Sequence, residues 1–172
     1  SPDKPADRAI LAYHELAKTG KASSRDLAEL GVLLLAKGFP DDAERFLRDA
    51  LEVDPDNFEA AYRLGLVLQR MGRDKDAVRF YRSVVQQRPG HAYARFMLAL
   101  AEERSGRRHA AIDDYAKAYR FMPELSDPAK NPLVLDSRLQ DLAQLRHYRD
   151  AQLAATLKVD AIDPEAVHRM ME

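Results

Sequence analysis

Apolar residues recur along this chain at intervals of three and four positions, the spacing that places them on one face of an α-helix. The clearest examples are residues 24–37 and 58–71, which end at Gly38 and Gly72. Glycine adopts the left-handed conformation that commonly ends a helix without steric cost. A second helical stretch then runs to a proline, Pro55 in the first case, whose missing amide donor discourages continuation. The pattern therefore predicts pairs of short helices joined by tight turns.

These helix pairs repeat every 34 residues. Shifting the sequence by this interval superimposes small or apolar residues from three successive copies. The superimposed sets are Leu30, Leu64 and Leu98; Gly31, Gly65 and Ala99; Gly38, Gly72 and Gly106; Ala43, Ala77 and Ala111; Leu47, Tyr81 and Tyr115; and Pro55, Pro89 and Pro123. Hairpins that cannot bury an apolar face alone must stack on their neighbours, and small residues then mark close helix crossings. Asp41 and Asp74 are expected to cap the second helix of their pairs.

This arrangement resembles the tetratricopeptide repeat, in which an apolar or aromatic residue, Leu-Gly, Gly, Ala, an aromatic residue, Ala and Pro stand at fixed offsets. The resemblance covers residues 24–125. It departs from the family pattern at Ala99, which replaces a glycine, and in the first aromatic column, which holds Leu27, Ala61 and Arg95. It implies an all-α fold, an α-α superhelical solenoid of tetratricopeptide helix hairpins. The three full repeats are expected over residues 24–57, 58–91 and 92–125.

The flanking segments extend the repeat pattern in weaker form. Residues 1–22 align with the second helix of a preceding, truncated repeat. After Pro123 the stretch PELSDPAKNPL breaks the phase with prolines that a helix interior does not accommodate. We expect residues 126–172 to form a loop followed by a degenerate repeat whose helices cap the solenoid. The whole chain, residues 1–172, is thus expected to be one tetratricopeptide-like domain.

The composition is that of a soluble globular protein without a strong overall charge. Of 172 residues 27 are basic and 28 are acidic, a net charge of -1 that argues against nucleic acid as a partner. The chain has no cysteine, which is compatible with the cytoplasm, the compartment we favour, and leaves other compartments open. No apolar stretch approaches the roughly 20 residues that span a membrane.

No motif in the sequence predicts catalysis, a metal site or a cofactor. His14 and Glu15 lie on a predicted helix, but Lys18 stands where a zinc hydrolase needs its second histidine. The sequence TGK at 19–21 ends like a phosphate-binding loop, yet Ala22 stands at the hydroxyl position. We therefore expect a non-enzymatic protein with no catalytic residues, no metal ligands and no cofactor.

The family resemblance implies that the first helix of each pair lines a concave groove. The candidate partner-binding residues on these helices are Val32, Tyr62, Arg63, Leu66, Gln69, Arg70, Tyr93, Phe96, Met97, Leu100 and Arg104. An apolar floor suits the apolar face of a partner peptide or helix, and the arginines at its edge favour acidic residues beside that face. The alternative is burial without a ligand, because the helix that begins near Tyr93 is apolar almost all round.

Three functions stay open at this level. The first is a protein-interaction scaffold that binds a partner peptide or helix in the concave groove. The second is a self-associating structural or assembly module, a homo-oligomer, which is compatible with the first. In the third, the basic turn RSGRRH, residues 104–109, contacts phosphate groups of nucleic acid.

Some members of the family that this chain resembles bind the C-terminal carboxylate of heat-shock chaperones through a clamp of Lys, Asn and Arg side chains. The offsets that carry this clamp are occupied here by Ala28, Val32, Arg63, Tyr93 and Met97. These side chains do not reproduce the clamp, so we expect no recognition of a chaperone C-terminus.

Overall fold

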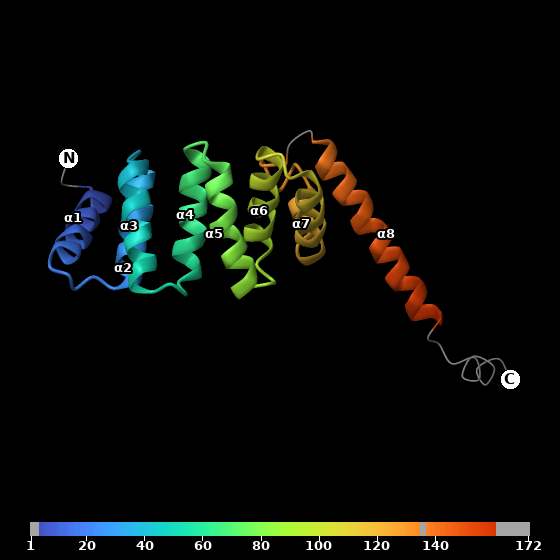
Figure 1. The fold of residues 1–172 in the computed structure, drawn as a ribbon, viewed down its shortest axis with the longest axis horizontal. Helices are drawn as coiled ribbons and strands as arrows, with labels where there is room; N and C mark the ends of the chain where they lie inside the picture. The colour runs from blue at the N-terminus through green and yellow to red at the C-terminus, as the bar shows by residue number, and fades with distance from the viewer. Residues whose placement is uncertain (1–3, 135–136, 161–172) are drawn as a thin grey trace.

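Eight α-helices and no strand make up residues 4–134 and 137–160, the part of the chain that the computed structural model describes. Figure 1 shows the helices stacked side by side in one row, with the last projecting from its end. This arrangement confirms the predicted all-α solenoid. The helices are α1 (Pro5–Lys18), α2 (Ser24–Ala36), α3 (Pro40–Val53), α4 (Phe58–Arg70), α5 (Asp74–Gln87), α6 (Ala92–Arg104), α7 (Arg108–Phe121) and α8 (Arg138–Asp160), with a 3₁₀ turn, η1, at Pro123–Ser126.

The predicted glycine stops are confirmed at the ends of α2, α4 and α6. Gly38, Gly72 and Gly106 have φ values of 86°, 76° and 83°, in the left-handed region. In the first of these turns the N–H of Phe39 donates a 2.9 Å hydrogen bond to the carbonyl oxygen of Leu34. This bond satisfies a carbonyl group that the end of the helix would otherwise leave without a donor.

The expectation that Asp41 and Asp74 cap the second helices is wrong. The N-cap residues of α3 and α5 are Phe39 and Arg73, and neither makes a side-chain capping bond. The residue after each glycine occupies the N-cap position of the second helix, so Asp41 and Asp74 already lie inside that helix. Asp74 instead lies in the first turn of α5, where its charge interacts favourably with the helix dipole.

Side-chain caps occur on the first helices of the pairs. Ser23, Asn57 and His91 stand one before α2, α4 and α6, and each accepts a hydrogen bond from a backbone N–H three residues later. The distances are 3.2, 3.0 and 3.1 Å in that order. Each cap satisfies one of the N–H groups that a helix start leaves without a partner.

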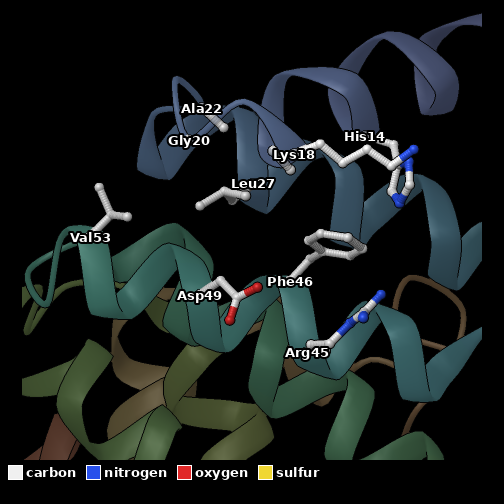
Figure 2. Close-up of a pocket in the computed structure, with 10 residues that line it drawn as sticks. His14, Lys18, Gly20, Ala22, Leu27, Arg45, Phe46, Asp49 and Val53 are labelled. Carbon is white, nitrogen blue, oxygen red and sulfur yellow. The ribbon is translucent and has the colours of Figure 1, made fainter.

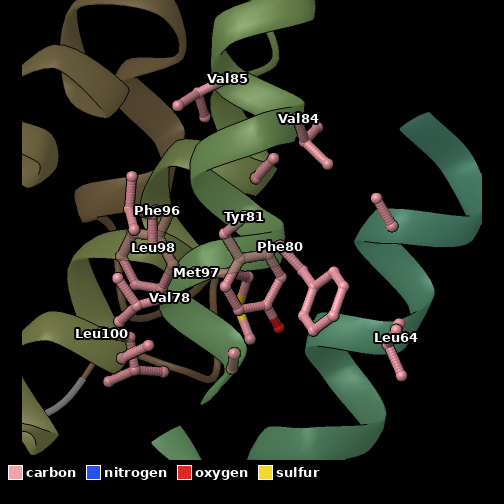
Figure 3. Packing of buried hydrophobic residues seen from close by; sticks show 14 of the residues in the cluster. Leu64, Val78, Phe80, Tyr81, Val84, Val85, Phe96, Met97, Leu98 and Leu100 are labelled. Atoms are coloured by element: carbon pink, nitrogen blue, oxygen red, sulfur yellow. The ribbon is translucent and has the colours of Figure 1, made fainter. Parts of the chain in front are cut away.

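The hydrophobic core runs through the middle of the row, between the two helices of each pair and between neighbouring pairs. Leu64, Tyr81 and Val84 are fully buried, and Figure 3 shows side chains of α5 lying between α4 and α6. Gly65 packs directly against the ring of Tyr81. The predicted small residue of this crossing is thus where the two helices of the pair approach each other.

The C-terminal part differs from the expected pair of capping helices. Residues 138–160 form one continuous helix, α8, of 23 residues. The sequence contains no glycine or proline over these positions, so no residue there favours a helix end. The start of α8 contacts the preceding pair, since Gln140 Nε2 donates a 3.3 Å hydrogen bond to the hydroxyl oxygen of Tyr115. The rest of the expected capping repeat, residues 161–172, lies outside the described residues.

No helix in the described part of the chain combines the length and the apolar character that crossing a bilayer requires.

Candidate partner-binding groove

A pocket of about 620 Å³ opens between α4, α6 and the segment that follows α7. Tyr62 and Leu66 line it from α4, and Tyr93, Phe96 and Met97 line it from α6. Residues three and four positions apart share one face of a helix, so each helix presents its contributions together. The pocket therefore joins the first helices of two successive pairs.

Tyr62 lies at the centre of a group of rings beside this pocket. Its ring centre is 5.2 Å from that of His91 and 5.9 Å from that of Tyr81. Burial raises the pKa of Tyr62, so its hydroxyl stays neutral at physiological pH and can donate a hydrogen bond. Tyr93, by contrast, is 53% exposed and offers an aromatic surface to solvent.

The proline-rich segment, residues 122–133, forms the other wall of the pocket. It is anchored by Leu125, which is 2% exposed. The side-chain amide of Asn131 donates a 2.8 Å hydrogen bond to the carbonyl oxygen of Leu125, and its Oδ1 accepts one of 3.1 Å from the N–H of Leu133. The chain itself thus covers part of the apolar surface of α6.

The structure brings some of the predicted groove residues together and separates others. Tyr62, Leu66, Tyr93, Phe96 and Met97 line the pocket, whereas Val32, Arg63, Gln69, Arg70, Leu100 and Arg104 do not. Val32 is half-buried on α2, one helix pair away. The candidate groove is therefore shorter than the predicted one and is centred on α4 and α6.

The expectation that Phe96, Leu100 and Gln69 face an open groove is wrong, because they are 1%, 2% and 8% exposed. The ring centre of Phe96 lies 5.3 Å from that of Tyr115, in the interface between α6 and α7. Oε1 of Gln69 accepts a 2.7 Å hydrogen bond from the hydroxyl of Tyr81. The alternative of burial without a ligand, suggested by the apolar character of α6, describes these three side chains.

The arginines at the edge of the groove are partly neutralised. Arg63 donates a 2.7 Å hydrogen bond to Glu59, one turn earlier on α4, and Arg104 lies 3.8 Å from Asp74. Arg70 is exposed and has no carboxylate partner among the described residues. The positive charge next to the pocket is therefore weaker than the sequence predicts.

A buried carboxyl group lies on the other side of α6. Glu102 is 1% exposed and accepts a 2.9 Å hydrogen bond from Arg82 of α5. Burial raises the pKa of Glu102, and the nearby Asp114 raises it further, against the opposing effect of Arg82. One oxygen of this carboxyl group has no hydrogen-bond partner among the described residues. Glu102 is thus a titratable group placed among core residues.

A second hollow, of about 360 Å³, lies between α1 and α3 (Figure 2). His14 and Lys18 line it from α1, and Phe46 lines it from α3. The imidazole of His14 packs edge-on against Phe46 with ring centres 6.1 Å apart, and Lys18 pairs with Glu15 at 3.1 Å. In the described part of the chain, no three His, Asp or Glu side chains are grouped as metal ligands. His14 has a packing role in this arrangement.

A family model described as the tetratricopeptide repeat matches residues 28–92 and 68–125. The chain belongs to the tetratricopeptide repeat family. Proteins of this family are generally non-catalytic interaction modules. No curated protein sequence matches this tetratricopeptide protein.

Solved structures with a similar fold include other tetratricopeptide proteins. YrrB, a tetratricopeptide protein with an unusual peptide-binding site, is 24% identical, with a TM-score of 0.63 and coverage of 69% of this chain and 61% of YrrB. MamA from Desulfovibrio magneticus RS-1 is 22% identical over 92% of this chain and 88% of that one, with a TM-score of 0.68. The first such module of Spaghetti (RPAP3), bound to the HSP90 peptide SRMEEVD, is 16% identical over 77% and 94%, with a TM-score of 0.57. At these identities the likeness shows the fold alone.

Proposed function

We propose that this protein is a non-enzymatic scaffold that binds one amphipathic peptide or helix of a partner protein between α4 and α6. The observation that carries the proposal is the pocket between Tyr62, Tyr93 and the proline-rich segment. Concave apolar sites with a few polar groups are where proteins commonly hold ligands. YrrB and the RPAP3 module, which share the fold, bind peptides.

The chemistry of the pocket defines the expected partner. Leu66 and the exposed ring of Tyr93 provide apolar surface, and aromatic side chains are enriched where proteins bind one another. Lys130 lines the pocket, and Arg70 lies one turn beyond Leu66 on α4. Such charges guide the encounter and orientation of a partner more than they add affinity. We infer a partner whose apolar anchors are accompanied by acidic residues.

A selection from a random peptide library on the immobilised protein tests this function. Peptides that bind in the groove should lose about 1–2 kcal/mol of binding free energy with Tyr93→Ala, a typical value for an interface anchor. Tyr148→Ala provides the matched control, because Tyr148 is similarly exposed, at 58%, but lies on α8. Selected peptides that bind Tyr93→Ala and wild type equally well would place recognition outside the groove.

Self-association is a second candidate function, favoured by the exposed apolar side chains of α8. Leu145, Tyr148 and Leu153 are 66%, 58% and 60% exposed. Exposed apolar groups of this kind mark surfaces that other molecules cover. Light scattering over a dilution series tests this function: a mass that rises with concentration for wild type and stays monomeric for Leu145→Glu supports it, and a monomeric wild type at all concentrations excludes it.

A further inference from the structure

The second helices of the pairs carry a cationic surface that the groove does not use. It contains a hollow of about 360 Å³ between α3 and α5 and another of about 330 Å³ between α5 and the start of α7. Lys75 and Arg79 line both hollows, so the two form one continuous surface. We call it the cationic surface. Its basic side chains are Arg48, Arg73, Lys75, Arg79, Arg82 and Arg107.

The spacing of charges on α5 brings like charges together at this surface. Lys75, Arg79 and Arg82 follow one another at intervals of four and three residues, so like charges are neighbours on one face. Such pairs of like charge destabilise a helix. Two other helices carry opposite charges at this spacing, Arg45 with Asp42 on α3 and Arg63 with Glu59 on α4. Lys75, Arg79 and Arg82 thus do not stabilise α5 through pairing with one another.

The carboxylates next to the cationic surface are already paired. The pairs are Arg48 with Glu44 at 2.7 Å, Arg73 with Glu44 at 2.7 Å, Arg73 with Asp76 at 2.8 Å and Arg82 with Glu102 at 2.9 Å. Among the described residues, the ion pairs of this region include none with Lys75, Arg79 or Arg107. The cationic surface therefore holds positive charge that the chain does not neutralise.

Two guanidinium groups of this surface are held in place by an aromatic ring. The guanidinium carbon of Arg79 lies 4.6 Å from the ring centre of Phe80, and that of Arg48 lies 5.6 Å from it. Phe80 itself is 8% exposed and belongs to the core. Cation–π contacts of this kind order arginine side chains, and an ordered guanidinium binds a carboxylate through two parallel hydrogen bonds.

We propose that the cationic surface binds an acidic segment of a protein partner, with Asp or Glu side chains that reach both hollows. A peptide is favoured over nucleic acid because Phe80 is too buried to stack on a base. The chain as a whole also has a net charge of only -1, so it lacks the broad positive field of nucleic-acid-binding proteins. This site lies on α3, α5 and the start of α7, and it stands whether or not the groove between α4 and α6 binds a peptide.

The test measures binding of a fluorescein-labelled octaglutamate peptide to the full chain by fluorescence anisotropy. We expect saturable binding that weakens as salt is raised from about 50 to 500 mM, because exposed charges are screened over this range. The double variant Lys75→Glu/Arg79→Glu should weaken binding at least about tenfold, since two attractive contacts become repulsive. Circular dichroism confirms that the variant stays folded.

The control is Lys117→Glu, which makes one of the two charge reversals of the double variant at an exposed position of α7 outside both hollows. Its affinity for octaglutamate should stay within about twofold of wild type. Three outcomes would overturn the proposal: no binding by wild type, an equal loss with Lys117→Glu, or tighter binding of a single-stranded oligonucleotide than of the peptide. Competition by inorganic phosphate at concentrations as low as those of the peptide would likewise assign the surface to phosphate.

Discussion

Gly65 and Tyr81 are in direct contact across the α4–α5 crossing: a β-carbon added at position 65 would lie 2.6 Å from Cε1 of Tyr81. Tyr81 is fully buried and cannot move aside into solvent. We expect Gly65→Leu to lower the free energy of unfolding by about 1–3 kcal/mol through overpacking, despite the better helix propensity of leucine. Urea denaturation measured by circular dichroism gives this value.

Gly90→Leu is the control for that substitution. Gly90 is exposed, has no atom near its added β-carbon and does not have a positive φ. Its free energy of unfolding should change by less than about 0.5 kcal/mol. If both leucine variants unfold like wild type, the helices do not cross at Gly65.

Phe96 and Tyr93 both lie on α6 and line the pocket, but their truncation should affect the free energy of unfolding to very different extents. Phe96 is 1% exposed and packs against Tyr115 and Tyr119, so Phe96→Ala should lower the free energy of unfolding by about 3–5 kcal/mol. Tyr93 is exposed, and Tyr93→Ala should change the free energy of unfolding by less than about 0.5 kcal/mol. Equal melting of the two variants would mean that Phe96 is not a core residue.

Glu102 makes stability depend on pH in a direction opposite to that of most carboxylates. Its pKa in the folded chain is raised above the ordinary value of 4.5, so the folded state binds more protons than the unfolded state just above that pH. The contribution of Glu102 to the free energy of unfolding should therefore fall as pH rises from 4.5 through its folded pKa, and stay constant above it. Glu102→Gln removes this dependence.

The measurement compares urea denaturation of wild type and Glu102→Gln between about pH 4.5 and 7.5. The stability of the variant relative to wild type should rise with pH. Glu59→Gln serves as the control, because Glu59 is half-exposed and pairs with Arg63 at the surface. If the stability of Glu102→Gln relative to wild type stays constant or falls as pH rises, the pKa of Glu102 is not raised by burial.

The chaperone peptide SRMEEVD, which the RPAP3 module binds, should not be recognised here through its C-terminal carboxylate. The offsets of the family clamp hold side chains such as Ala28 and Met97, both buried. Any affinity that its acidic residues give it should be the same within about twofold for the free acid and the C-terminal amide, as expected of an exposed charge. Calorimetric titration of both peptides measures this. Binding that is abolished by amidation would show that the protein recognises the C-terminal carboxylate after all.

The array itself could be predicted because its determinants are local and repeated. Gly38 is restricted by its positive φ, and Gly65 by its close contact with Tyr81. The recurrence of small residues at these positions every 34 residues can be recognised in the sequence. The same spacing could have revealed the cap positions of Ser23, Asn57 and His91. His91 hides that series, because histidine is not one of the preferred capping residues.

The candidate groove could be predicted only in part, because burial depends on segments that do not follow the repeat. The 34-residue periodicity places Tyr62 and Phe96 on the first helices of their pairs. The same periodicity is compatible with a groove whose apolar residues are open to solvent and with one whose apolar residues are buried. The proline-rich segment covers part of α6 through contacts of Leu125 and Asn131, which no repeat position specifies. The continuity of α8, by contrast, was readable from the absence of glycine and proline between 138 and 160.

No residue of α1 is buried, although neighbouring helices place many side chains in the core. Helices with so little buried surface open locally at a small fraction of the free energy of global unfolding. The amide protons of α1 should therefore exchange with solvent well before those of α4 and α6. Because each pair in such an array is supported mainly by its neighbours, this opening exposes the hollow of Figure 2 and leaves the distant groove unchanged. Local opening of α1 and recognition between α4 and α6 are thus separate equilibria.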